Sequence, residues 1–233
     1  LDLAERTLDL IADKVAVAAT LVGYSTQFDE KGERGDALET LEEAYQILQS
    51  QPEKEVRNSA EKFNLYASGA ALFARYEKVE RGLEIASDIR GETARHSALN
   101  QIAQICAARA QDDLAHQAIN LIDDESARLF ALIALSDVKR RLEKREEAVQ
   151  YLIEARAFGA GVPQFSSRSL AYNQLAERFH ALGETETARE IASESLETVA
   201  QIRDSASKAI GILYVSDVFK SLGFELKQNE RDA

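Results

Sequence analysis

The sequence predicts an all-α fold, a solenoid of about 12 helices arranged as antiparallel pairs. Small residues recur along the chain with spacings of 33, 45, 33, 33 and 40 residues, and a fixed period of this size is typical of repeat proteins. Apolar residues around each small residue follow helical spacing, and only two prolines interrupt the chain. The recurring small residues are Ala4, Ala37, Gly82, Ala115, Ala148 and Ala188.

Each repeat contains two amphipathic helices, which we name helix A and helix B. Counting back from Ala148, apolar residues lie sixteen and thirteen positions earlier, at Leu132 and Leu135, and the small residue Ser136 lies twelve positions earlier. These residues share one face of helix A. Apolar side chains return four and seven positions after Ala148, on helix B. The same pattern surrounds Ala37, Gly82, Ala115 and Ala188, with a departure at Gly69.

The elements follow in a simple order along the chain. A leading helix B surrounds Ala4, and because its own helix A is missing, we expect a further segment upstream. Five helix pairs follow, and a trailing helix A ends near Leu222. Residues 50–53 and 158–163 contain the two prolines and are predicted loops. We therefore expect a single solenoid over residues 1–223, followed by a tail over residues 224–233.

Small residues are expected where helix A crosses helix B. An Ala, Gly or Ser on both helices lets their axes approach to the near end of the roughly 8–10 Å packing range. Bulky side chains then fill the space on either side of the crossing. Most repeats place such a residue nine positions before the small residue, as at Phe28, Phe73 and Phe179, whereas Cys106 and Lys139 stand there in the two middle repeats.

This pattern resembles the tetratricopeptide repeat (TPR), in which small and aromatic residues mark the same faces of helices A and B. The resemblance covers nearly the whole chain and implies a right-handed α-solenoid whose concave surface is formed mainly by helices A. The chain departs from the family pattern in three ways. The usual Trp is Leu or Tyr, most repeats lack the closing proline, and the period is 33 residues where the family has 34.

Charge and composition exclude several classes of function. The chain has 28 basic and 40 acidic residues, a net charge of −12, whereas nucleic-acid binding requires a clustered basic surface. The same sign argues against binding to anionic lipid, and no apolar run approaches the roughly 18–20 residues that span a bilayer. A single cysteine is compatible with a reducing cytoplasm, the compartment that we favour.

Catalytic, cofactor and metal sites find little support in the sequence. Cys106 stands at a core position and is interpreted as a packing thiol. The best metal-like group is Asp112, Asp113 and His116, but two aspartates at the start of a helix B are better explained as stabilising that helix end. We therefore expect no catalytic residue, no cofactor and no metal, and classify the chain as not an enzyme.

The residues of helices A that face away from helices B suggest a peptide-binding groove. Neutral amides can both donate to and accept from a peptide backbone. The hypothesis is a protein–protein interaction scaffold that binds a peptide or protein segment on its concave side; the alternative is an ordinary solvated helix face. The candidate residues are Asn100, Gln101, Gln104, Arg140, Asn173, Gln174, Glu177 and His180.

Two other functions stay open at this point. The trailing helix A is apolar on more than one face, so the chain could be a structural segment that self-assembles through Ile210, Leu213 and Tyr214 into a homo-oligomer. An enzyme would need a pocket, and the place to look for one is around His180, Glu177 and Arg140. The lysine-rich clamp that some TPR proteins use for C-terminal carboxylates is not recognisable here.

Overall fold

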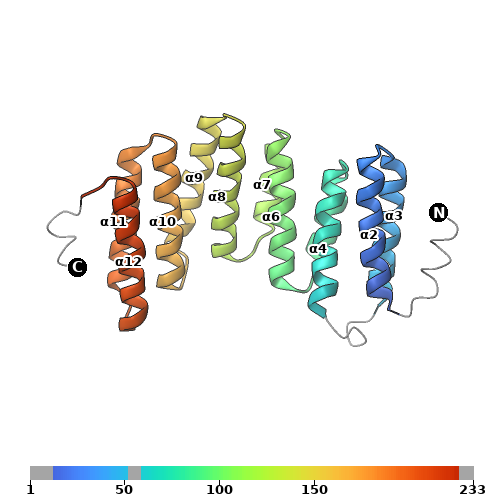
Figure 1. The fold of residues 1–233 in the computed structure, drawn as a ribbon, viewed down its shortest axis with the longest axis horizontal. Helices are drawn as coiled ribbons and strands as arrows, with labels where there is room; N and C mark the ends of the chain where they lie inside the picture. The colour runs from blue at the N-terminus through green and yellow to red at the C-terminus, as the bar shows by residue number, and fades with distance from the viewer. Residues whose placement is uncertain (1–12, 52–58, 226–233) are drawn as a thin grey trace. The chain divides into compact units, whose positions relative to one another are not determined.

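The computed structural model describes residues 13–51 and 59–225, and every helix or strand assigned there is an α-helix (Figure 1). The chain divides into two compact units, Leu1–Leu121 and Ile122–Ala233. The described helices of the first unit are α2 (Lys14–Glu30), α3 (Arg34–Ser50), α4 (Ser59–Arg75), α5 (Val79–Asp88), α6 (Glu92–Ala108) and α7 (Asp112–Asn120). Those of the second unit are α8 (Glu125–Arg141), α9 (Arg145–Gly159), α10 (Phe165–Ala181), α11 (Thr185–Ala200) and α12 (Ser205–Ser221).

The helices form the predicted pairs. In the first unit α2 packs against α3, α4 against α5, and α6 against α7; in the second, α8 packs against α9 and α10 against α11. Helix α12 is the trailing helix A and ends within one residue of the predicted Leu222. The leading helix around Ala4 lies outside the described residues. The prediction of an all-α fold of antiparallel helix pairs is confirmed, whereas a single solenoid over residues 1–223 stays a prediction.

Within each pair the two helices pack as closely as expected from the small residues at their crossing. Ala37 and Ala148 are fully buried, and the Ser25 hydroxyl on α2 donates a 2.8 Å hydrogen bond to the Ala37 carbonyl on α3. A Cβ atom placed on Gly82 of α5 would lie 2.6 Å from the carbonyl oxygen of Ala70 on α4. No side chain larger than hydrogen fits at Gly82 unless the backbone moves.

The predicted loop at residues 158–163 begins later than expected. Helix α9 continues through Gly159, although glycine usually weakens a helix. A Cβ atom on Gly159 would lie 2.5 Å from the ring of Tyr172 on α10, so the absence of a side chain lets the end of α9 meet that ring. Close packing between two helices therefore explains this glycine, which lies within the predicted loop.

Every described helix A ends in the same turn. The residue two positions after the helix has a positive φ, and the next residue donates its N–H to a carbonyl five positions earlier, as in Lys144 to Lys139. Because the same turn follows α12, with Phe224 donating to Phe219, the sixth helix A ends like the other five. The positive-φ residues are Gly32, Glu77, Ala110, Glu143, Gly183 and Gly223.

A second recurring feature was missed by the sequence analysis. The fourth residue of α4, α6, α8, α10 and α12 is always Lys or Arg. Arg168 donates from Nε and Nη2 to the Val162 carbonyl at 2.9 and 2.7 Å, and Lys208 donates to the Ala200 carbonyl at 3.2 Å. These cations satisfy carbonyl groups near the end of the preceding helix B, where positive charge is favourable. These basic residues recur with the repeat, so the repeat pattern of the sequence could have revealed them.

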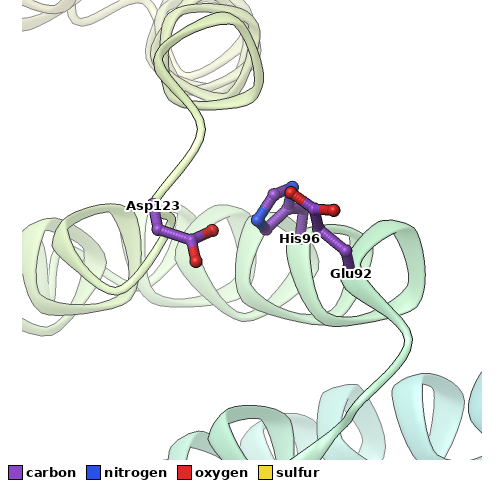
Figure 2. A group of neighbouring side chains, drawn as sticks. All are labelled: Glu92, His96 and Asp123. Atoms are coloured by element: carbon purple, nitrogen blue, oxygen red, sulfur yellow. The ribbon is translucent and has the colours of Figure 1, made fainter.

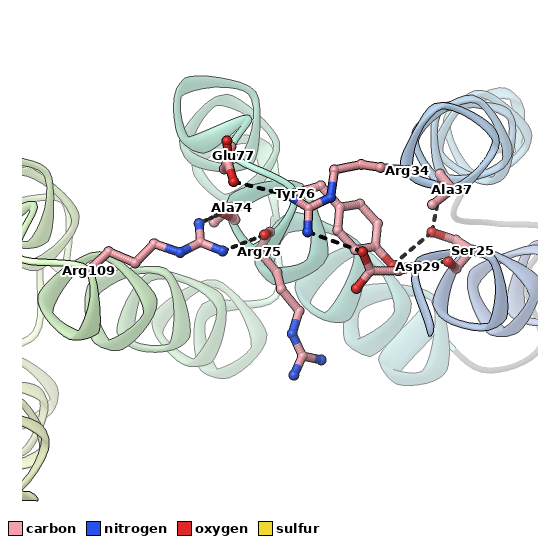
Figure 3. A network of polar contacts seen from close by, with 9 residues as sticks. All are labelled: Ser25, Asp29, Arg34, Ala37, Ala74, Arg75, Tyr76, Glu77 and Arg109. Carbon is pink, nitrogen blue, oxygen red and sulfur yellow. Dashed lines mark hydrogen bonds and ion pairs between the residues drawn. The ribbon is translucent and has the colours of Figure 1, made fainter. Parts of the chain in front are cut away.

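Polar contacts also join successive pairs in the first unit (Figure 3). The buried Tyr76 hydroxyl donates to the Ser25 carbonyl at 3.1 Å, and burial raises the pKa of this phenol. Arg34 bridges Asp29 and Glu77, with nitrogen–oxygen distances of 3.3 and 3.0 Å. Arg109 donates to two carbonyl groups at the end of α4. In the part of the chain that is described, no helix is long and apolar enough to cross a membrane.

Candidate functional site

A groove of about 550 Å³ lies on the second unit between two helices A, α10 and α12. Helices α10 and α12 pack directly against each other, so the groove runs along their shared seam. Three of the predicted binding residues, Asn173, Gln174 and Glu177, line it. The remaining lining residues are Leu170 and Arg178 from α10, and Tyr214, Asp217, Val218 and Ser221 from α12.

Asn173 is the most informative residue of this groove. Its side chain is 5% exposed, and its Oδ1 atom has no hydrogen-bond partner among the described residues. The equivalent ninth position holds the buried Ile133 in α8, the half-buried Asn100 in α6 and the exposed Leu213 in α12. A buried polar atom without a partner costs about 1–3 kcal/mol of folding free energy. An oxygen left in this state in the folded protein would lower stability by that amount.

The groove carries two carboxylates without partners. Glu177 and Asp217 are exposed, and neither side chain takes part in a hydrogen bond or ion pair with another described residue. Arg178 does not offset them, because Asp137 on α8 accepts from its Nε atom at 3.1 Å. Its Nη1 atom also donates to the Gln174 carbonyl at 3.2 Å. The free charge of the groove is therefore negative.

Two of the predicted residues lie beside the groove. Arg140 on α8 places its Nε atom 3.7 Å from Asp137, the same carboxylate that holds Arg178. His180 on α10 packs its ring edge-on against Phe224, with ring centroids 5.8 Å apart. Phe224 also contacts Phe219, so this part of the predicted tail folds back onto the ends of α10 and α12. Neither Arg140 nor His180 is among the lining residues, and their binding roles stay predictions.

The other three predicted residues belong to the first unit. Gln104 donates from Nε2 to the Oδ1 atom of Asn100 at 3.2 Å, and Gln101 donates to the Ser97 hydroxyl at 3.2 Å. All of these contacts join residues four positions apart on α6, and they satisfy part of the polar capacity of the amides. Their proposed role in binding is therefore separate from that of the groove on the second unit.

The residues predicted for self-association are exposed on α12. Ile210, Leu213 and Tyr214 are 55%, 66% and 64% exposed. Tyr214 also lines the groove, whereas Ile210 and Leu213 do not. Peptide binding and self-association therefore share Tyr214. Substitutions of Ile210 and Leu213 can separate the two hypotheses.

A second cavity, of about 480 Å³, lies in the first unit. The rings of Tyr45 and Tyr66 meet there edge-on at 5.6 Å, and the Lys62 ammonium lies 5.7 Å from the Tyr66 ring centroid. Gln51, the last described residue before the gap at 52–58, forms part of the wall.

The described residues bring together little that could perform catalysis. Cys106 is fully buried, and burial raises the pKa of its thiol to about 11, so the reactive thiolate is scarce near neutral pH. His116 directs Nδ1 at the backbone carbonyl of Asp112, 2.9 Å away. Figure 2 shows Glu92 and His96 one turn apart on α6; Asp123, also drawn, belongs to the second unit.

The architecture of the helix pairs is sufficient to classify the fold. Within each unit, antiparallel A and B helices cross at small buried residues, and every described helix A ends in the same left-handed turn. Both units have a TPR-like fold. The regular spacing of the small residues, 33, is one residue shorter than the 34 of the TPR.

Comparison with known proteins adds no function to this TPR-like chain. No protein-family model matches it, and no curated protein matches it. One solved structure with similarity to the chain is a putative kinesin light chain from Podosopora anserina with nearly identical TPR-like repeats. The identity is 18%, the match covers 84% of this chain and 100% of that one, and the TM-score is 0.39. Similarity at this level carries no functional inference.

Proposed function

We propose that this TPR-like chain is a protein-interaction scaffold that binds a segment of another protein in the groove between α10 and α12. The observation that carries the proposal is Asn173, which lines the groove and whose buried Oδ1 atom has no hydrogen-bond partner among the described residues. A peptide backbone presents N–H groups at regular intervals, and one of them can donate to this oxygen.

The remaining lining suits a peptide chain. Leu170 and Val218 offer apolar contact from opposite helices, and Gln174 supplies an amide that both donates and accepts. Binding surfaces commonly combine apolar contact with a few polar groups that fix orientation. An exposed groove along two helices can hold a segment that continues beyond both of its ends, unlike an enclosed cavity.

The test uses random peptides of about twelve residues, displayed on phage and selected on the immobilised full chain. The selected peptides are then synthesised, and their affinities are compared between the parent and the Asn173→Leu variant. We expect about tenfold weaker binding by Asn173→Leu, because the peptide loses its acceptor. The matched control is Asn64→Leu, the same substitution at an exposed residue of α4, which should leave the affinity unchanged. If no selected peptide distinguishes the two variants, the groove is not the binding site.

The amides on α6 form a separate part of the hypothesis. Asn100, Gln101 and Gln104 lie on the first unit and are tested by Asn100→Ala in the same binding assay. Weaker binding by this variant would extend the site to the first unit. Unchanged binding would restrict the site to the groove of the second unit.

Self-assembly through α12 is a second candidate function, supported by the exposure of Ile210 and Leu213. Its test is sedimentation equilibrium over a range of protein concentrations. A mass that rises with concentration in the parent, and not in an Ile210→Ser, Leu213→Ser variant, would support this candidate. A monomer mass throughout would rule it out.

A further inference from the structure

We infer that the segment bound between α10 and α12 is basic and places a Lys or Arg side chain beside Glu177 and Asp217. The inference rests on the proposed function, because it names the chemistry of the partner for the same groove. It is carried by the two carboxylates together with the buried amide oxygen of Asn173, which lines the same groove.

The carboxylates are available to a ligand. Neither Glu177 nor Asp217 makes a hydrogen bond or ion pair with another described residue. They come from α10 and α12, the two helices between which the groove lies. The only cation in the lining, Arg178, is already held by Asp137. An acidic or phosphorylated segment would therefore meet repulsion, and a basic segment would meet attraction.

The other lining groups suit the rest of a Lys or Arg side chain. Tyr214 is 64% exposed and can present its ring face to an ammonium or a guanidinium group. Leu170 and Val218 provide apolar contact for the methylene stem. The Oδ1 atom of Asn173 has no hydrogen-bond partner among the described residues, and the same segment supplies backbone N–H donors. The net charge of −12 over the whole chain adds long-range attraction for a basic partner.

The experiment extends the peptide selection on the full chain. Selected peptides are titrated against the parent and against a Glu177→Gln, Asp217→Asn variant, at about 50 mM and about 300 mM NaCl. The matched control is Glu146→Gln, Glu197→Gln, which removes two charges from exposed positions of α9 and α11, outside the groove. Circular dichroism checks that both double variants are folded.

The expected result has three parts. The selected peptides share a Lys or Arg, and replacing it by Ala weakens binding about tenfold. The groove variant weakens binding by a similar factor, whereas the control changes it less than about twofold. The added salt weakens binding to the parent more than to the groove variant, because less charge remains there to be screened.

Two other outcomes would overturn the inference in different ways. Peptides that lose affinity on Asn173→Leu but have no basic residue, and bind the groove variant normally, would leave the proposed function intact and contradict the basic partner. Peptides that depend on neither Asn173 nor the two carboxylates would overturn the proposed function, and the inference with it.

Discussion

Arg178 on α10 is held by Asp137 on α8, with its Nε and Nη2 atoms each 3.1 Å from the same carboxylate oxygen. The two side chains are 26% and 24% exposed. The contact joins the helices A of successive pairs in the second unit, and it engages the only cation among the groove-lining residues. The negative charge of the groove therefore depends on a residue outside it.

Asp137→Asn should weaken the binding of a basic peptide several-fold. The substitution leaves the Arg178 cation without its carboxylate, so positive charge appears beside Glu177. Stability should fall by only about 0.5–1 kcal/mol, because the pair is partly solvated. Titration with a selected Lys-containing peptide measures the first effect and urea unfolding the second. Unchanged affinity would mean that Arg178 does not influence the ligand.

Asn173→Leu should stabilise the chain by about 1 kcal/mol while it weakens peptide binding. The variant removes a buried amide oxygen that has no partner among the described residues and introduces an apolar residue, as the buried Ile133 is at the equivalent position of α8. A higher urea midpoint than in the parent is the expected result. A large loss of stability would show that the amide has a structural partner and would remove the main support for a ligand at this position.

Ala148→Leu should destabilise the chain by about 1–3 kcal/mol, because the fully buried Ala148 lies where α9 crosses α8. A control is Gln150→Leu, which adds an apolar side chain at an exposed position of the same helix. Thermal or urea unfolding compares the two variants. An unchanged midpoint for Ala148→Leu would contradict close helix packing at the small residues.

Glu147 should make stability depend on pH in the acid range. Its carboxylate lies 2.6 Å from the ammonium of the fully buried Lys139, and the contacts with Lys139 and Lys144 lower the pKa of Glu147. A pKa that is lower in the folded state stabilises the fold above the unfolded pKa, near 4.3, and this stabilisation is lost as the pH falls through the folded pKa. The Glu147→Gln variant should be less stable at neutral pH and should lose less stability on acidification. Parallel pH profiles would contradict this.

The periodic features of the fold could be predicted from the sequence. Ala37, Ala148 and the other small residues mark the helix crossings because close packing admits few residue types there. The exact helix ends were harder to predict, because a tertiary contact with Tyr172 decides that α9 includes Gly159. Lys139 was recognised at an aromatic position, but its pairing with Glu147 depends on the geometry between α8 and α9.

Only the α10 side of the candidate groove could be predicted from the sequence. Asn173, Gln174 and Glu177 follow from the repeat pattern, which places them on the face of helix A that points away from its helix B. Tyr214 and Asp217 lie some forty residues later on α12 and had not been considered together with them, because the pattern within a repeat says nothing of the seam between repeats. His180 belongs to the same predicted face of helix A. Its contact with Phe224 could not be predicted, because Phe224 lies outside the repeat pattern.

The most direct test of the central claim is hydrogen–deuterium exchange of the full chain with and without a selected Lys-containing peptide. Exchange is followed separately over α10, α12 and α6. We predict that the peptide slows exchange in α10 and α12 and leaves α6 unchanged, because ligand binding stabilises the elements that it contacts. Slower exchange confined to the first unit, or no change in α10 and α12 at saturating peptide, would contradict binding in the groove between these two helices.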